Sequence, residues 1–179
     1  MNRRMPGGEE KLQKHFDLFI KLWTKFVSFI DWISKGPRPW RLCIEWPKGC
    51  DYWRWDIVTK ILNKYSLEEV CFDGCAFGLK SRAGGLMKKP WRVCTNDENI
   101  LKSFKPFVCS NTGCKLTDHS HDLCHGIDCK ESENYTFQMT RRVHKSVRET
   151  QKNMFIKSIF KACTSSIDNR YDFESCDCN

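Results

Sequence analysis

Three short apolar runs and one amphipathic stretch constrain the middle of this 179-residue chain more than any other feature. Residues 41–45 (RLCIE), 69–73 (EVCFD) and 91–95 (WRVCT) have the length and composition of buried strands. Residues 56–67 (DIVTKILNKYSL) carry apolar residues at helical spacing. Helices that alternate with strands are typical of an α/β fold.

A long amphipathic helix is predicted ahead of this unit, over residues 9–34. Its apolar residues recur at intervals of four and three: Leu12, Phe16, Phe19, Trp23, Phe26, Ile30 and Ile33. The segment KGPRP then ends the helix, because Gly36 suits a helix C-terminus and two prolines prevent its continuation. Such a regular stripe favours packing on a sheet over membrane anchoring.

The sequence contains no apolar run of membrane-spanning length and no signal-peptide pattern. We therefore expect an intracellular protein without a membrane partner, in either the nucleus or the cytoplasm. Twelve cysteines in an unsecreted chain of this size indicate reduced thiols rather than a disulfide framework. Cys43, Cys71 and Cys94 lie in predicted strands, where cysteine packs as a small apolar residue.

Two acidic residues, Glu45 and Asp73, each close a predicted strand. Ligands of parallel α/β sheets bind at the carboxyl ends of the strands, so both are candidate site residues. The alternative is that each is the first polar residue after a buried run, and position alone leaves both interpretations open. Residues 74–89, rich in glycine and lysine, predict a loop or hairpin.

Metal-capable side chains gather in the third part of the chain. Seven lie within 21 residues: Cys109, Cys114, His119, His121, Cys124, His125 and Cys129. Thiolate and imidazole ligands clustered in this way suit tetrahedral zinc.

The tightest candidate metal ligands are four of these seven, with Cys109 and Cys129 as substitutes: Cys114, His119, His121 and Cys124. Their spacing matches no standard zinc finger. Two interpretations remain open, namely one structural zinc held by four protein ligands, or a loop of reduced, unligated side chains.

A formal net charge of +8 favours anionic partners such as nucleic acid without deciding the matter. Residues 135–151 predict a basic helix, whose charges are more typical of a solvated face than of a nucleic-acid contact. We divide the chain into a partial α/β unit (1–103), a Cys/His-rich segment with the basic helix (104–150) and a tail (151–179).

Six blocks follow one another from residue 7 to about residue 147: GGEEKLQKHFDLFIKLWTKFV, IEWPKGCDYW, FDGCAFGLKS, KKPWRVCTN, CKLTDHSHDLCHG and ENYTFQMTRRVH. In this order they resemble an uncharacterised family found in eukaryotic hypothetical proteins and retrotransposon-associated polyproteins. None of its blocks has an assigned chemistry. Fuller members carry a strand that ends in a Pro-Cys-Thr motif ahead of the long helix.

The order of elements also resembles, more distantly, the C-terminal part of DNA cytosine methyltransferases, which are Rossmann-like. IEWP stands where those enzymes have Glu-Asn-Val, with Trp-Pro in place of Asn-Val, and KKPWRV resembles their basic strand. The resemblance implies a base-contacting role for Glu45, with Asp73 as a second candidate. It also implies that Lys88, Lys89 and Arg92 would hold a phosphate or order the site.

The chain lacks two parts that cytosine methylation needs. It has no Pro-Cys dipeptide to present a nucleophile, and no glycine-containing first strand–helix turn to hold S-adenosylmethionine, so that cofactor is not expected. Cys50 and Cys75 each follow a glycine in a predicted turn without a histidine nearby in sequence. We interpret both as structural residues.

Two functions remain open. The first is a retroelement-associated, methyltransferase-like fragment with a partial Rossmann-like sheet, a long N-terminal helix and a Cys/His-rich extension, not catalytic alone. Its partner would be the missing N-terminal half of the domain or a polyprotein neighbour. The second is a zinc-stabilised module that binds nucleic acid or a protein through its basic loop and helix.

Overall fold

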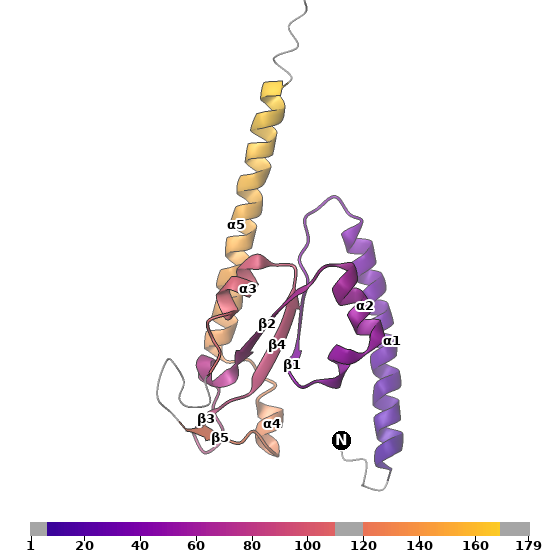
Figure 1. Cartoon of the computed structure of the whole chain (residues 1–179), viewed down its shortest axis with the longest axis vertical. Coiled ribbons are helices and arrows are strands. Elements are labelled where there is room, and N and C mark those ends of the chain that lie inside the picture. The colour runs from indigo at the N-terminus through magenta and orange to yellow at the C-terminus, as the bar shows by residue number, and fades with distance from the viewer. Residues whose placement is uncertain (1–6, 110–119, 169–179) are drawn as a thin grey trace, which may run out of the picture. The chain divides into compact units, whose positions relative to one another are not determined.

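The computed structural model of this chain describes residues 7–109 and 120–168, with side-chain exposure up to residue 157. It is a mixed α/β protein with several helices and a small sheet (Figure 1). The chain divides into two compact units, Met1–Trp40 and Arg41–Asn179, and each is described by itself. The boundary predicted at residues 103 and 104 falls inside the second unit.

The first unit consists of helix α1, Gly8–Ser34, which confirms a helix over the predicted range. Aromatic rings follow one another along it, with the centroid of Trp23 5.7 Å from that of Phe19 and 5.1 Å from that of Phe26. The helix ends where the sequence predicted. The backbone N–H of Gly36 donates to the carbonyl of Ile33, and Pro37 follows.

The second unit is built on a three-stranded sheet with the order β1-β4-β2. Its strands are β1 (Cys43–Pro47), β2 (Glu68–Asp73) and β4 (Pro90–Thr95), so all three predicted strands are present. Both pairings are antiparallel. The parallel pairing that a Rossmann-like sheet requires is therefore not found in this sheet.

One face of the sheet carries the main hydrophobic core. Helices α3 (Glu98–Phe104) and α5 (Phe137–Asp168) supply its other side. The core residues from the strands and these two helices are Val70, Phe72, Trp91, Val93, Ile100, Phe104 and Met139. Burial of this apolar surface is the main stabilising contribution to the unit.

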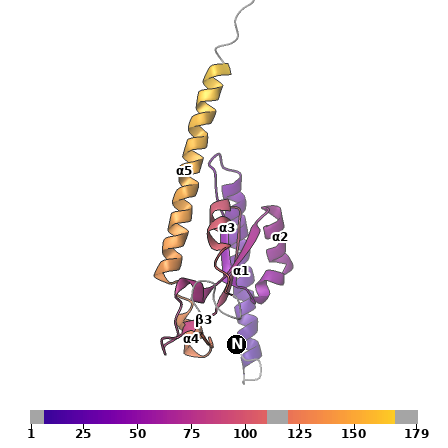
Figure 2. The same ribbon diagram turned by 60° about the vertical axis from the view of Figure 1, so that its left-hand side comes forward.

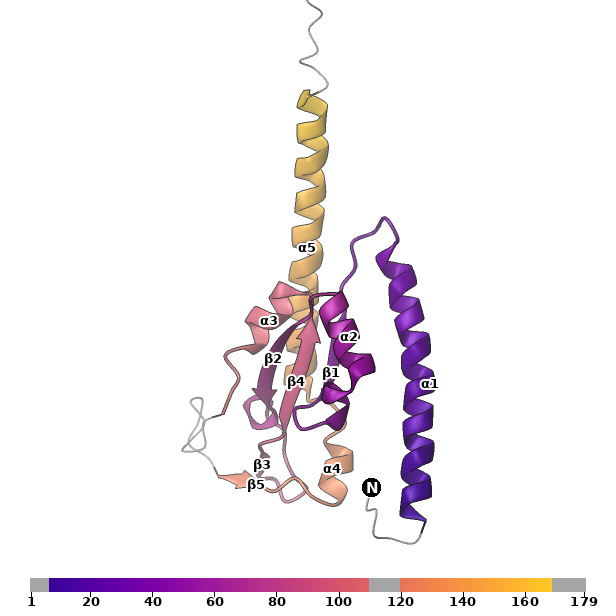
Figure 3. The same cartoon turned by 45° about the vertical axis from the view of Figure 1, so that its right-hand side comes forward.

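The opposite face of the sheet is covered by the 3-10 helix η1 (Asp51–Arg54) and helix α2 (Asp56–Lys64), as Figure 3 shows. Buried Trp53 contacts this face. Its ring centroid lies 4.7 Å from that of Trp46, and the Arg92 guanidinium lies 4.8 Å from the Trp53 ring. The sheet is thus covered on both faces.

Helix α5 is tied to α3 through one buried carboxylate. Asp97 caps α3 by accepting from the N–H groups of Asn99 and Ile100. The hydroxyl of Thr150, on α5, donates to the same carboxylate at 2.8 Å. Beyond this contact α5 extends past the end of the sheet (Figure 2). None of the helices in the described parts of the chain has the length and hydropathy of a membrane-spanning segment.

Candidate metal centre

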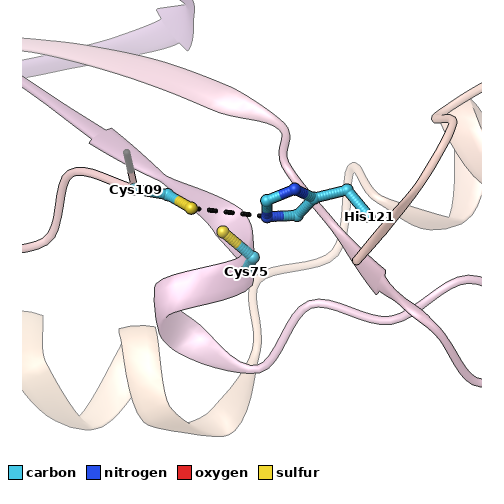
Figure 4. Close-up of side chains that lie close together, drawn as sticks. All are labelled: Cys75, Cys109 and His121. Atoms are coloured by element: carbon cyan, nitrogen blue, oxygen red, sulfur yellow. Dashed lines mark hydrogen bonds between the residues drawn. The ribbon is translucent and has the colours of Figure 1, made fainter. Parts of the chain in front are cut away.

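Two cysteines and a histidine from separate segments meet at one end of the second unit. Cys75 lies in the 3-10 helix η2 (Gly74–Phe77), Cys109 follows α3, and His121 begins strand β5 (His121–Asp122). Their side chains point toward one another in Figure 4. Both cysteines are buried and the histidine is half-buried, and the three ligand atoms all lie within 4.8 Å of one another.

The spacing of these atoms fits a tetrahedral zinc ion. Zn–S bonds of about 2.3 Å and Zn–N bonds of about 2.0–2.1 Å separate two sulfurs by about 3.8 Å, and a sulfur from a nitrogen by about 3.6 Å. The Sγ of Cys109 lies 3.4 Å from Nε2 of His121. An ion between the three groups therefore requires only small displacements, and it replaces a weak thiol–imidazole contact with coordination bonds.

A tight turn after β2 positions Cys75. Gly74 begins it, because a Cβ at this position would lie 2.7 Å from Cδ2 of Leu79, too close for any side chain without displacement. Gly78 ends it in the left-handed conformation, with φ of 72°, and its N–H donates to the carbonyl of Cys75. The sequence GCAFG thus fixes the place of the thiol.

Asp73 holds Cys109 beside this turn. The buried Asp73 carboxylate accepts the backbone N–H of Cys109 at 2.7 Å, and the Asp73 N–H donates to the carbonyl of Phe107 at 2.9 Å. These bonds attach the segment after α3 to the end of β2. Asp73, predicted as a base-contact candidate, therefore has an observed role in positioning a metal-capable thiol.

His121 is placed by a two-stranded parallel pair. Strand β3 (Leu86–Met87) pairs with β5, with Leu86 opposite His121. The carboxylate of Asp122 accepts a hydrogen bond from Ser81. A Cβ at Gly85 would lie 2.2 Å from that carboxylate, so any other residue there would displace the Asp122 side chain from its hydrogen bond with Ser81.

One of the four predicted metal ligands belongs to this group. His121 is a member of the group and Cys124, which the structure describes, is not. Cys114 and His119 lie outside the described residues. Cys109, predicted only as a substitute, is a member. Cys75 was missed because it lies far upstream in sequence, although a cysteine between two turn glycines directly after a strand was a usable signal.

Glu45 lies apart from the metal group and apart from Asp73. In the register it pairs with Val93, whereas Asp73 pairs with Pro90. Since successive residues of a strand point to opposite faces, the two carboxylates lie on opposite faces of the sheet. They therefore do not form a shared site, which corrects the prediction from parallel strand ends.

Glu45 faces a pocket of about 320 Å³ between β1 and helices α3 and α5. The Tyr135 hydroxyl donates a hydrogen bond to its carboxylate. Removal from water raises the pKa of Glu45, and the bond from Tyr135 opposes that rise. Cys43 lines the same pocket, and although the residue is exposed, the partial removal of its thiol from water and the nearby Glu45 carboxylate raise its pKa to about 11. That thiol is therefore protonated, and not nucleophilic, at neutral pH.

The basic residues expected to contact phosphate are engaged within the protein. Lys89 donates to the carbonyl and the hydroxyl of Ser132, both at 3.0 Å. Arg92 forms an ion pair with Glu69, and Lys88 is half-exposed. A phosphate-binding role for Lys88, Lys89 and Arg92 stays a prediction.

The chain matches no protein-family model, no curated protein and no solved structure. Its resemblance to retrotransposon-associated and methyltransferase proteins therefore stays a prediction as well. The functional argument depends on the geometry of the described residues.

Proposed function

We propose that this protein is a zinc-stabilised module that binds nucleic acid through the exposed basic face of α5. The observation that carries the proposal is the convergence of Cys75, Cys109 and His121. These residues belong to three different segments, namely η2, the chain after α3, and β5. A metal ion held there cross-links these segments, which is the role of structural zinc. The two thiols are buried, and a fourth protein ligand in addition to the three described would close the site as in structural zinc centres.

The basic face of α5 supplies the binding surface. Its exposed basic residues recur at helical intervals on one side: Arg141, His144, Lys145, Arg148 and Lys152. The intervening acid, Glu149, is the one negative charge along this stretch of the face. Four arginine and lysine side chains along one helix face can contact phosphates and release counterions, which gives salt-dependent binding.

The methyltransferase-like interpretation has less support. It relies on strand order and on Glu45 as a base-contacting residue, and the sheet of the described residues is antiparallel. The observation in its favour is the pocket beside Glu45, where a carboxylate and a tyrosine hydroxyl meet above apolar side chains. Failure of the purified protein to fold unless an upstream segment is supplied would support the fragment, whereas binding of S-adenosylmethionine would contradict the prediction that the cofactor-binding part is absent.

Two measurements test the proposal. Elemental analysis of the purified protein is expected to give one zinc per chain, with loss of the metal in Cys75→Ser. Binding of a fluorescent single-stranded or duplex DNA is expected to weaken as salt rises, with a slope of about −0.7 to −0.9 per phosphate contact. Replacing Arg141, Lys145 and Arg148 with glutamine should reduce this slope by about 2 to 3.

A matched control carries Lys48→Gln, Lys60→Gln and Lys64→Gln, which likewise remove three exposed positive charges elsewhere in the same unit. It is expected to retain the salt slope of the original protein. Equal weakening in both variants would mean that net charge alone drives binding. Zinc-free protein with an unchanged melting temperature would reject the structural role of the metal.

A further inference from the structure

Cys124 and Cys129 form a close thiol pair in the segment that follows β5. Their sulfurs are 3.8 Å apart, and the thiol of Cys129 also donates to the backbone carbonyl of Cys124 at 3.3 Å. Cys129 is exposed and Cys124 is half-buried. Neither belongs to the metal-capable group found among the described residues.

The pair is held by hydrogen bonds on a defined part of the fold. Buried Ser132 donates to the carbonyl of Cys129 at 2.8 Å, and its oxygen lies 3.6 Å from Sγ of Cys124. Lys89 donates to the same serine. The buried Ser132 side chain therefore contacts both cysteine residues and holds the two sulfurs close together.

Helix α4 (Ile127–Glu131), which carries Cys129, is anchored a second time. The backbone N–H of Arg82 donates to Asp128 at 3.0 Å, and Nε of its guanidinium donates to Glu131 at 2.8 Å. Both contacts join α4 to the loop that precedes β3. Contacts that restrict the movement of α4 lower the entropy lost when two thiols are joined.

We propose that Cys124 and Cys129 form a thiol–disulfide exchange site for low-molecular-weight disulfides of the glutathione type. The hydrogen bond with Cys124 raises the pKa of Cys129, so its thiolate is a minor form at neutral pH and becomes more abundant as the pH rises. This thiolate attacks one sulfur of glutathione disulfide, which breaks that S–S bond and releases one glutathione thiolate. The thiolate of Cys124 then attacks Sγ of Cys129 and releases the second. Two protein thiols are oxidised to one disulfide, and one disulfide is reduced to two glutathione thiols, which take up the two protons.

Only a small movement of the two sulfur atoms is needed to form a disulfide between Cys124 and Cys129. The sulfurs must approach by about 1.8 Å to reach the S–S bond length of about 2.05 Å. An exposed disulfide in a small ring is more easily reduced than a buried structural one. The pair is therefore reduced in a strongly reducing glutathione pool and oxidises as the disulfide fraction of the pool rises.

The experiment uses the full-length, zinc-loaded protein in glutathione mixtures of increasing disulfide fraction. After acid quenching, free thiols are blocked with N-ethylmaleimide and the protein is digested with trypsin. The tryptic peptide 116–130 contains these two cysteines and no other. We expect it to appear without maleimide and lighter by two hydrogen atoms, in a proportion that follows the glutathione ratio reversibly.

Variants separate the two steps. Cys124→Ser is expected to accumulate one glutathione on Cys129, because the resolving thiol is gone, whereas the control Cys43→Ser should behave as the original protein does. Persistence of the glutathione adduct in the original protein would overturn the proposal. So would oxidation that begins only after a chelator is added, since both thiols would then be metal ligands.

Discussion

Loss of one metal-capable thiol should remove the stabilisation that zinc gives to the protein. Cys109→Ser changes a sulfur for an oxygen at a buried position and leaves the backbone N–H that Asp73 holds. Loss of an outer-shell partner already costs about 10- to 100-fold in metal affinity, so we expect loss of a direct ligand to cost at least 100-fold.

The size of the effect follows from linkage. With free zinc buffered at about 100 times the dissociation constant of the original protein, zinc adds about 2.7 kcal/mol to the free energy of unfolding. A variant that binds about 100-fold more weakly gains about 0.4 kcal/mol at the same zinc concentration. The difference of about 2.3 kcal/mol corresponds to about 5–9 °C in melting temperature for a chain of this size.

The assay is a pair of thermal melts for each protein, one with buffered zinc and one with chelator. Because each protein is its own reference, the cost of burying a serine hydroxyl cancels. Cys43→Ser, a thiol outside the metal group, should keep the full zinc-dependent shift. An equal shift in the Cys109 variant would refute the assignment of this thiol as a ligand.

Three further predictions address the surroundings. Asp73→Asn removes the charge that holds the Cys109 amide, so zinc affinity measured by competition with a chromophoric chelator should fall by about 10- to 100-fold, and an unchanged affinity would contradict the positioning role. Tyr135→Phe removes the hydrogen bond that opposes the raised pKa of Glu45, so a carbon-13 NMR titration of that carboxyl should give a still higher pKa. Stability falls with pH between the unfolded-state and folded-state pKa values of this carboxyl, so the fall should extend to higher pH, whereas a lower pKa would show that the bond favours the neutral form. Asp97→Ala removes the cap of α3 and leaves a buried hydroxyl of α5 without its acceptor, so urea unfolding should show a loss of about 2–4 kcal/mol, and a loss below about 1 kcal/mol would mean that α5 is not anchored there.

Local patterns in the sequence predicted the elements but not how the strands pair. The apolar runs at 41–45, 69–73 and 91–95 lie within two residues of β1, β2 and β4. An apolar run has the same appearance in parallel and antiparallel sheets, so strand direction was inferred from the order of elements, and the inference of parallel pairing was wrong for this sheet. Helix α3 was missed because its seven residues are too short for a clear period.

The candidate site was predicted in part for a related reason. Clustering in sequence identified His121 and offered Cys109 as a substitute, because ligands that are close along the chain need no knowledge of the fold. Cys75 joins them only through the turn after β2, and the Asp73–Cys109 bond exists only once α3 has packed. Contacts of that kind depend on tertiary structure, and they cannot be predicted from the periodicity or spacing of residues in the sequence.

The division of the metal ligands among η2, the end of α3 and β5 has a consequence for the order of folding. The first ligand precedes β4 and the last follows α3, so the complete set exists only after the β2–β4 pair has formed and α3 has docked. Contacts between distant parts of a chain form late, since the intervening loops must close first. Zinc uptake should therefore mark the last step of folding, and a chain released from the ribosome before residue 121 should not retain the metal.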